Sequence, residues 1–334
     1  MQDTLPIPTR DDVERAIALG VRAPSIHNTQ PWRWMYNHGV LELHADRSRQ
    51  LSVLDPDGRS VLLSCGAAVE LARLGLAARG WHTDVDRMPD HDRPDLLARI
   101  RPLGRTAVDP AVTERSAAVE RRYSDRRPFR DEPVPYQAVD RLVAMAADGD
   151  VYAAAVQRAD ERLDLAVVFS WADQVEAGDA DYRAELARWT RHEGEGAPDG
   201  VPASAVPHAV PGSPRHTDVP MRDFEAGITG GETLSEGVDE QPLYLVVFTV
   251  DDTPEARLRA GEAYARLSVE VERLGLASSA MTQAVDLPAV RERFRALMDW
   301  PDHPQMVLRV GWPQDAPRPE PTGRRPVSEV LTFD

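Results

Sequence analysis

The stretch that decides the fold is APSIHNTQPW, residues 23–32. Its two prolines fix the backbone φ angle and lack an N–H donor, so they interrupt the helical pattern that precedes them. Between the prolines the loop displays Ser25, Asn28 and Gln30, whose side chains can both donate and accept hydrogen bonds. Such a set can bind a flat heterocycle that carries carbonyls and ring nitrogens. The alternative is a structural turn in which these side chains cap backbone groups.

Helices and strands are predicted on both sides of this loop. Residues 9–22 place apolar side chains at helical spacing, residues 40–45 alternate as a strand with one wet face, and residues 60–79 form a long apolar helix. Trp32 and Trp34, at the entry to a strand, are expected in the core. Further helices are predicted at 111–122, 136–147, 158–191 and 255–274, and further strands at 244–250 and 306–310.

The two long helices predicted at 60–79 and 255–274 have similar surroundings. Each is followed by a glycine, Gly80 or Gly275, of the kind that ends a helix. The similarity is weak, but it suggests a duplicated unit whose two copies have diverged.

Composition excludes several classes of function. The net charge of -16 disfavours nucleic acid as a partner, since binding phosphates along a strand needs a basic face. All 39 basic residues are arginine, which excludes Schiff-base chemistry and a lysine-dependent phosphate loop. Cys65 is the only cysteine, so no intramolecular disulfide and no thiolate metal cage can form. The nine histidines show no repeated ligand spacing, and we expect no metal site.

Targeting and catalytic signatures are also missing from the sequence. No uninterrupted apolar run approaches the roughly 20 residues that span a bilayer, and the acidic, amphipathic N-terminus does not resemble a signal peptide. We therefore expect a cytoplasmic protein without a membrane partner. The chain has no G-x-S-x-G, H-E-x-x-H or P-loop pattern, so the usual catalytic signatures are absent.

Two arginine clusters remain to be explained. RRYSDRRPF, residues 121–129, places Arg122, Ser124 and Arg126 close together, and Arg324 and Arg325 lie near the C-terminus. One interpretation is a solvated face that surrounding carboxylates balance. The other is an anion pocket, in which guanidinium groups fork onto phosphate oxygens and the serine hydroxyl adds a donor.

Residues 192–235 lose all periodicity. Six prolines fall between Pro198 and Pro220, with several glycines near them. Loops of this length inside a compact domain are usually lids, binding loops or disordered segments. Because valines at four positions could dock the segment on the protein, we expect a lid that packs over the binding cleft. These valines are Val201, Val206, Val210 and Val219.

Taken together, these motifs resemble those of the FMN-dependent nitroreductases. The loop is similar to the family pattern Pro-Ser-x-x-Asn-x-Gln-Pro-Trp, and RRYSDRRPFRDEPVP is similar to its Arg-x-Ser-x-Arg/Lys segment. LGLASSAM, MVLRVGWP and RRPVSEVL resemble the final third of the family, so the resemblance covers most of the chain outside 192–240. It implies an α+β fold with a central, mainly antiparallel sheet in each half, flanked by helices.

The order of the motifs departs from the ordinary family. Ordinary members carry the arginine segment first, and they form homodimers in which each flavin takes its arginines from one subunit and its Pro-Ser loop from the other. Here the loop precedes the arginine segment, so one chain could complete one site. This resembles the single-chain, dimer-mimicking Acg-like branch known from actinobacteria. It implies a monomer with two fused, unequal halves related by a pseudo-twofold axis: residues 1–112 with the loop, and 113–334 with the arginines and the lid.

The resemblance also implies a set of residues that bind FMN. Thr282 and Gln283 stand where the family usually has an acidic residue and a glycine whose backbone approaches the flavin N5. The phosphate or ribityl chain is assigned to Arg122, Ser124, Arg126, Arg324 and Arg325, and the loop contributes Pro24, Ser25, Asn28 and Gln30.

The implied reaction is reduction of a nitro, quinone or enone compound, with NADH or NADPH as the electron donor and the flavin carrying the chemistry. Two alternatives stay open: an FMN-sequestering or storage protein with a closed lid, and a flavin oxidase that tailors a natural product.

Overall fold

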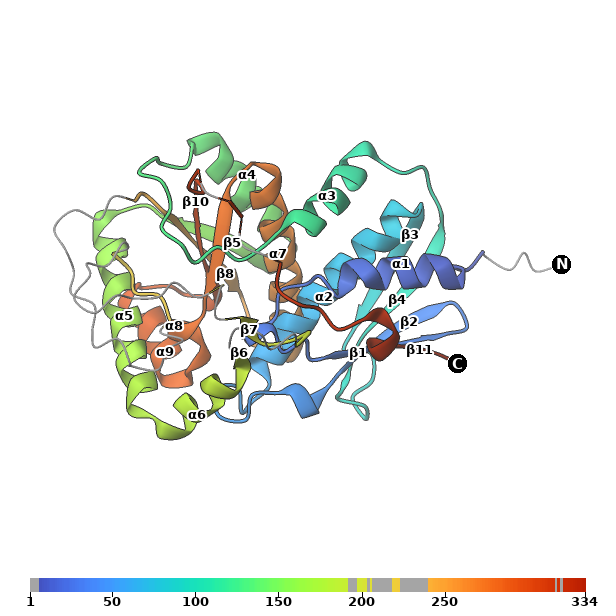
Figure 1. The fold of residues 1–334 in the computed structure, drawn as a ribbon, viewed down its shortest axis with the longest axis horizontal. Helices are drawn as coiled ribbons and strands as arrows, with labels where there is room; N and C mark the ends of the chain where they lie inside the picture. The colour runs from blue at the N-terminus through green and yellow to red at the C-terminus, as the bar shows by residue number, and fades with distance from the viewer. Residues whose placement is uncertain are drawn as a thin grey trace.

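The computed structural model describes residues 6–191, 197–202, 205, 218–222, 240–315, 317–318 and 321–334 (Figure 1). Most of the predicted lid, with Val206 and Val210, lies outside these residues. The described parts form a five-stranded sheet of order β11-β1-β2-β4-β3, a four-stranded sheet of order β5-β8-β10-β9, and a two-stranded sheet of β6 (Thr190–Arg191) and β7 (Val201–Pro202).

The elements of the first half come in chain order, apart from the last strand. They are α1 (Arg10–Gly20), β1 (Trp32–Asn37), β2 (Val40–Ala45), α2 (Arg59–Ala78), β3 (Trp81–Arg87), β4 (Leu96–Arg105) and β11 (Leu331–Phe333). Two short 3-10 turns, Ile26–Asn28 and Arg47–Arg49, stand beside β1 and β2 in the chain. The connecting helix α3 (Pro110–Arg121) follows.

The second half contains the remaining elements. They are α4 (Tyr136–Ala146), β5 (Val151–Val156), α5 (Ala159–Gly178), α6 (Ala180–Trp189), β8 (Leu243–Thr249), α7 (Pro254–Arg273), β9 (Ala277–Met281), α8 (Gln283–Asp286), α9 (Pro288–Leu297), β10 (His303–Gly311) and α10 (Val327–Val330). The helix predicted at 158–191 is divided at Asp179, which caps α6 by accepting from two backbone N–H groups.

Topology confirms the duplication that the two glycine-terminated helices suggested. The series α1-β1-β2-α2-β3-β4 is repeated as α4-β5-β8-α7-β9-β10, and the order β1-β2-β4-β3 matches β5-β8-β10-β9. Within both repeated four-strand units the described neighbouring strands pair antiparallel. The glycine after each long helix has a left-handed φ, +79° at Gly80 and +74° at Gly275, which ends the helix and starts the next strand.

A pseudo-twofold axis passes between α2 and α7, which cross at two glycines. A Cβ on Gly66 would lie 1.9 Å from the carbonyl oxygen of Leu258, and a Cβ on Gly261 would lie 2.0 Å from that of Leu63. Leu63 and Gly66 stand in α2 at the same positions as Leu258 and Gly261 in α7. Reciprocal contact between equivalent residues is what a twofold axis produces, so the chain packs against itself as two subunits of a dimer would.

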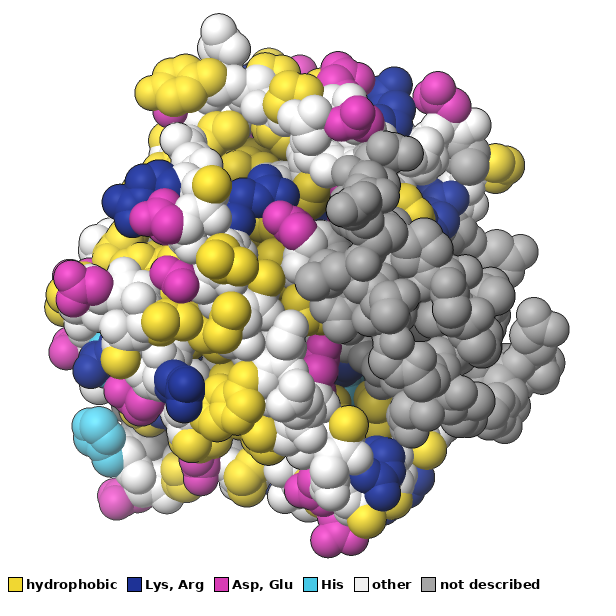
Figure 2. Space-filling model, turned by 90° about the vertical axis from the view of Figure 1, so that its left-hand side faces the viewer, with side chains coloured by type: hydrophobic (Ala, Val, Ile, Leu, Met, Phe, Trp, Pro, Cys, Tyr) yellow, Lys and Arg dark blue, Asp and Glu magenta, His cyan; other side chains and the backbone are white. Residues whose placement is uncertain are grey.

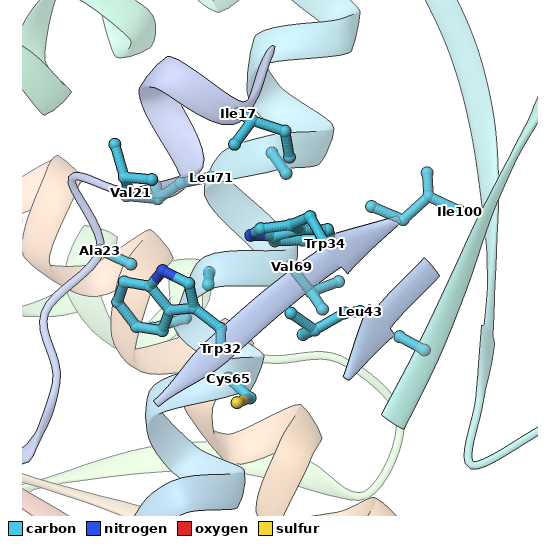
Figure 3. Close-up of a cluster of buried hydrophobic side chains, with 14 of the residues drawn as sticks. Ile17, Val21, Ala23, Trp32, Trp34, Leu43, Cys65, Val69, Leu71 and Ile100 are labelled. Atoms are coloured by element: carbon cyan, nitrogen blue, oxygen red, sulfur yellow. The ribbon is translucent and has the colours of Figure 1, made fainter. Parts of the chain in front are cut away.

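The core of the first half confirms the prediction for its two tryptophans. Trp32 and Trp34 are 0% and 1% exposed, and Figure 3 shows their rings beside α2 with Ile17 and Ile100 nearby. Cys65 is buried in the same cluster, and burial raises the pKa of its thiol. The thiol is therefore packing material rather than a nucleophile.

The C-terminal tail returns to the first half. β11 pairs in parallel with β1, with Leu331 opposite Trp34 and Phe333 opposite Tyr36. The last strand thus completes the sheet of the N-terminal half, although it belongs to the range 113–334. Because the tail runs from β10 in the second half to β11 in the first, residues 321–325 lie at the junction between the two halves.

Two helices differ in what they expose. By length and composition α2 could cross a membrane, but most of it is buried, as the central helix of a core is. α5 covers the second sheet with Phe169, which is 0% exposed, while Leu163 and Val167 on its outer side are 65% and 51% exposed. Figure 2 shows this side of the molecule, where hydrophobic and charged side chains are interspersed.

Candidate functional site

A cavity lies at the junction of the two halves. Ser60 and Ser64 of α2 and Tyr264 of α7 form one wall. The other walls come from the loop at 24–28, the arginine segment at 122–126, the end of β9, the tail at 321–324, and described parts of the Pro-rich segment. Every motif that the sequence singled out contributes to this one cavity.

The loop at residues 23–32 has a strained backbone conformation. His27, Asn28 and Gln30 have φ angles of +43°, +55° and +50°, a left-handed region that residues other than glycine rarely adopt. The N–H of Ile26 donates to Ser64 Oγ at 3.1 Å, and that of Gln30 donates to Ser25 Oγ at 3.0 Å. Three such residues within four positions mark a segment whose shape is imposed by its surroundings, as is common at binding sites.

The arginine segment is docked against the edge of β9. Ser124 bridges Ser278, and the N–H of Asp125 donates to the carbonyl of Ser278 at 2.9 Å. Asp125 in turn accepts from Arg127 at 2.8–2.9 Å. Arg127 is therefore turned away from the cavity, whereas Arg122 and Arg126 line it.

One end of the cavity is a cluster of three arginines. Arg22, Arg122 and Arg324 all line it, and within the described chain no carboxylate lies within 4.0 Å of their guanidinium groups. Burial, together with Arg122 and Arg22, lowers the pKa of Arg324 to about 9. Burial also lowers the pKa of Arg122, and that of Arg126 to about 10.

Two donors in this cluster have no acceptor. The Nε atoms of Arg122 and Arg324 are buried without a hydrogen-bond partner. An unsatisfied, buried, cationic donor is costly unless a ligand completes it. The solvated-face interpretation does not fit Arg122, which is only 8% exposed. The arrangement fits a multiply charged anion such as a phosphate monoester.

At the other end of the cavity, the charge of Arg222 is balanced by two carboxylates. Arg222 donates to Asp286 at 2.7 Å and to Glu176 at 3.1 Å, and its Nη1 lies 2.7 Å from His27 Nε2. Since a guanidinium only donates, Nε2 accepts and the ring proton sits on Nδ1. Burial, with the charges of Arg222 and Arg126, lowers the pKa of His27 well below its ordinary value, so the ring is neutral. Thr282 Oγ1 also donates to Asp286, at 2.6 Å.

The structure brings most of the predicted site residues to the cavity. Those that line it are Pro24, Ser25, Asn28, Arg122, Ser124, Arg126, Thr282, Gln283 and Arg324. Sequence reasoning did not single out Arg22, His27, Arg222 and Tyr264, which also line it. His27 lies inside the quoted loop and could have been included, whereas Arg222 stands in an aperiodic stretch that gave no signal.

Gln30 and Arg325 do not line the cavity. Gln30 is 0% exposed; its amide donates to the carbonyl of Pro198 at 2.8 Å and accepts from the N–H of Arg325 at 2.8 Å. The Arg325 side chain lies 3.4 Å from the Gln30 carbonyl and 3.7 Å from Glu329. These two residues join the loop, the tail and the Pro-rich segment behind the cavity wall.

Asn28 has a similar joining role from within the cavity. Its Nδ2 donates to the carbonyls of Gly200 at 3.0 Å and Gly323 at 3.1 Å. Arg49 pairs with Asp199 on the same segment. The loop therefore fixes the start of the Pro-rich segment beside the cavity.

The pseudo-symmetric position in the other half is filled. Arg87 stands as far beyond Gly80 as Thr282 stands beyond Gly275, and its guanidinium forks onto Glu262 with two contacts of 2.7 Å. Glu262 is 0% exposed. In the first half, a buried ion pair therefore stands at the position that the cavity-lining Thr282 has in the second half.

The chain is similar over nearly its full length to proteins named as nitroreductases. No protein-family model matches the chain. A Mycobacterium tuberculosis protein named "Putative NAD(P)H nitroreductase" is 37% identical over 335 residues, covering 98% of this chain and 92% of that protein. "Putative NAD(P)H nitroreductase acg" of the same organism is 33% identical, covering 99% and 98%. Among solved structures, a Bacteroides fragilis nitroreductase with bound FMN matches 63% of this chain and 95% of its own at 13% identity and a TM-score of 0.37, too distant for transferring positions.

The chain belongs to the nitroreductase family. Within that family it belongs to the Acg-like branch, in which one chain mimics the dimer, as its repeated topology and its full-length similarity to acg show.

Proposed function

We propose that the chain binds FMN in the cavity between its halves and uses NADH or NADPH to reduce a small nitro, quinone or enone compound. The observation that carries the proposal is the cluster of Arg22, Arg122 and Arg324, in which the buried Nε donors of Arg122 and Arg324 have no acceptor. FMN supplies a phosphate for this cluster and a flat, hydrogen-bonding ring for the rest of the cavity. The choice of NADH or NADPH as electron donor follows the names of the M. tuberculosis relatives, which are putative NAD(P)H nitroreductases.

The chain's own residues would bind and orient the cofactor. Arg122 and Arg324 would present Nε donors to the phosphate, and Ser124, which lines the same cavity, would add a hydroxyl. At the opposite end, His27 is neutral and Arg222 is neutralised by two carboxylates, so this end offers hydrogen bonds without a net positive charge. Hydride transfer to and from the ring is chemistry that FMN supplies when bound.

A second candidate is an FMN-sequestering protein. Asn28 and Gln30 bind the carbonyls of Gly200 and Pro198, which fixes the start of the Pro-rich segment at the cavity. A segment held in this way could exclude NAD(P)H and substrate while retaining the flavin. The same site would then store the cofactor rather than turn it over.

Anaerobic reduction separates the two candidates. FMN-loaded protein is mixed with NADPH or NADH, and the flavin absorbance is followed. Bleaching within seconds, followed by reoxidation with a nitroaromatic or a quinone, supports the reductase. Bleaching by dithionite alone contradicts the reductase and supports sequestration. Oxidation of an organic substrate without NAD(P)H, with oxygen as the electron acceptor in an aerobic assay, would instead indicate the oxidase.

We also propose that the protein is a cytoplasmic monomer. The crossing of α2 and α7 at Gly66 and Gly261 places inside one chain the contact that two subunits would otherwise make. Sedimentation equilibrium should give the mass of one chain, 37.0 kDa, and a mass twice that value would contradict the monomer.

A further inference from the structure

A second cavity, of about 230 Å³, lies where the connecting helix α3 meets both central helices. It is lined by α2, α3, α4, α7 and β3 and shares no lining residue with the first cavity. On α2 the first cavity is reached by Leu63 and Ser64, whereas Leu71 and Leu74, two turns further on, reach the second. The proposed FMN site makes no use of it.

The polar part of this cavity has an excess of positive charge. Arg73 lies 3.1 Å from Glu70 and Arg266 lies 3.6 Å from it, so two guanidinium groups share one carboxylate of the wall. Arg73 also lies 4.0 Å from Glu262, and Arg266 lies 3.6 Å from Asp148, the same distance as from Glu70; neither Glu262 nor Asp148 lines the cavity. Arg115, on α3, has no carboxylate of the described chain within 4.0 Å.

Two donors here also lack an acceptor. The Nε atoms of Arg73 and Arg115 are buried without a hydrogen-bond partner. As in the first cavity, buried guanidinium donors without acceptors point to an anion, because the desolvation of the group is otherwise uncompensated.

Apart from His82 and Thr83, the rest of the wall is largely apolar. It is formed by Leu71, Leu74, Val112, Met145, Val269 and the edge of Trp81, whose ring is fixed by Arg105 stacked at 4.6 Å. A fully hydrated ion such as free phosphate would leave this surface without a partner. A carboxylate attached to a compact apolar body would satisfy both parts of the cavity.

We propose that the second cavity binds a small amphiphilic carboxylate. Arg115 and Arg73 hold the carboxylate, and the apolar body lies against Leu74, Val112 and Trp81. The site is independent of the FMN site, so the two can be occupied together.

Isothermal titration with 2-naphthoate tests this directly. One molecule should bind per chain, and naphthalene-2-methanol, which lacks the charge, should bind at least tenfold more weakly. Arg115→Met should weaken binding of 2-naphthoate about ten- to a hundredfold, the usual effect of losing a charged hydrogen bond. Arg73→Met, at a side chain that is 34% exposed, is a second variant in case the first does not fold.

Three controls make the result decisive. Arg101→Met, on the outer part of β4, and Arg122→Ala, in the first cavity, should both leave the affinity for 2-naphthoate unchanged. Equal affinity for the acid and the alcohol, or unchanged affinity in both the Arg115 and Arg73 variants, overturns the proposal. So does loss of binding in Arg122→Ala, which would place the ligand in the first cavity. Displacement by an equal concentration of inorganic phosphate would show a simple anion site and contradict an amphiphilic ligand.

Discussion

Substituting Arg324 should lower the affinity for FMN without lowering the stability of the FMN-free protein. Its pKa is lowered from 12.5 to about 9 by burial and by Arg122 and Arg22, which at pH 7 corresponds to a penalty of roughly 4–5 kcal/mol for keeping the charge in the FMN-free protein. Both the folded and the unfolded chain carry that proton at pH 7, so the penalty is fully present there and shrinks only as the pH rises above about 9. Arg324→Met removes the penalty, and the FMN-free protein should gain stability or lose none.

The same variant should bind FMN more weakly. Loss of a charge-assisted contact to the phosphate costs about 1.5–3 kcal/mol, or roughly ten- to a hundredfold in Kd. Fluorescence titration of FMN gives the affinity, and urea unfolding of the FMN-free protein gives the stability.

Arg325→Met is the matched control. The sequence assigned both arginines to the phosphate, but the Arg325 side chain lies on the carbonyl of Gln30 and near Glu329, so its variant should keep most of the FMN affinity. If Arg324→Met lowers the stability of the FMN-free protein as much as it lowers FMN affinity, the arginine is structural and the anion-site argument fails.

Three further perturbations follow from the structure. Asn28→Ala removes two buried hydrogen bonds to backbone carbonyls and should lower stability by about 2–3 kcal/mol while speeding FMN release; an unchanged release rate in stopped-flow would show that the Pro-rich segment does not retain the flavin. Burial raises the pKa of Asp55 to about 6, so its contribution to stability is full below the unfolded value of 3.8 and is lost as the pH rises through 6. Between pH 4 and 7 Asp55→Asn should therefore gain about 2 kcal/mol relative to the parent in urea unfolding, and a constant difference would contradict this. Gly66→Ala places a Cβ 1.9 Å from a carbonyl of α7 and should cost about 3 kcal/mol, whereas Gly178→Ala, with open space around it, should be neutral or slightly stabilising; similar values for the two would remove the evidence for close helix crossing.

Much of the fold could be predicted from the sequence because its signals are local. The strand at 40–45 and the helix at 136–147 carry clear periodicity, and the structure places β2 and α4 there to within one residue. β5 and β9 were not predicted, because VYAAAV and ASSAM are short and built largely from small residues with little alternation. β11 depends on a pairing with β1 across almost the whole chain, which no local pattern reveals.

The site shows the same division. The residue types of the loop and of the arginine segment predicted an anion and a polar heterocycle, and the structure brings Ser25, Arg122 and Arg324 to one cavity. The sequence could not predict that Arg324 faces the cavity while its neighbour Arg325 does not. Gln30 and Arg325 satisfy each other's backbone groups behind the wall, an outcome that depends on where the tail crosses the loop.

One chain is proposed to build one FMN site from its two halves, and the flavin stoichiometry measures the number of such sites. Purified protein is saturated with FMN, freed of excess, and denatured by heat; the released flavin is measured by absorbance against protein concentration. We predict one FMN per chain, because the buried ion pair of Arg87 and Glu262 stands in the first half at the position that the cavity-lining Thr282 has in the second. A ratio of two would show a second flavin site and contradict the prediction of one site per chain. A ratio near zero under saturating FMN would show that the cavity does not bind the flavin.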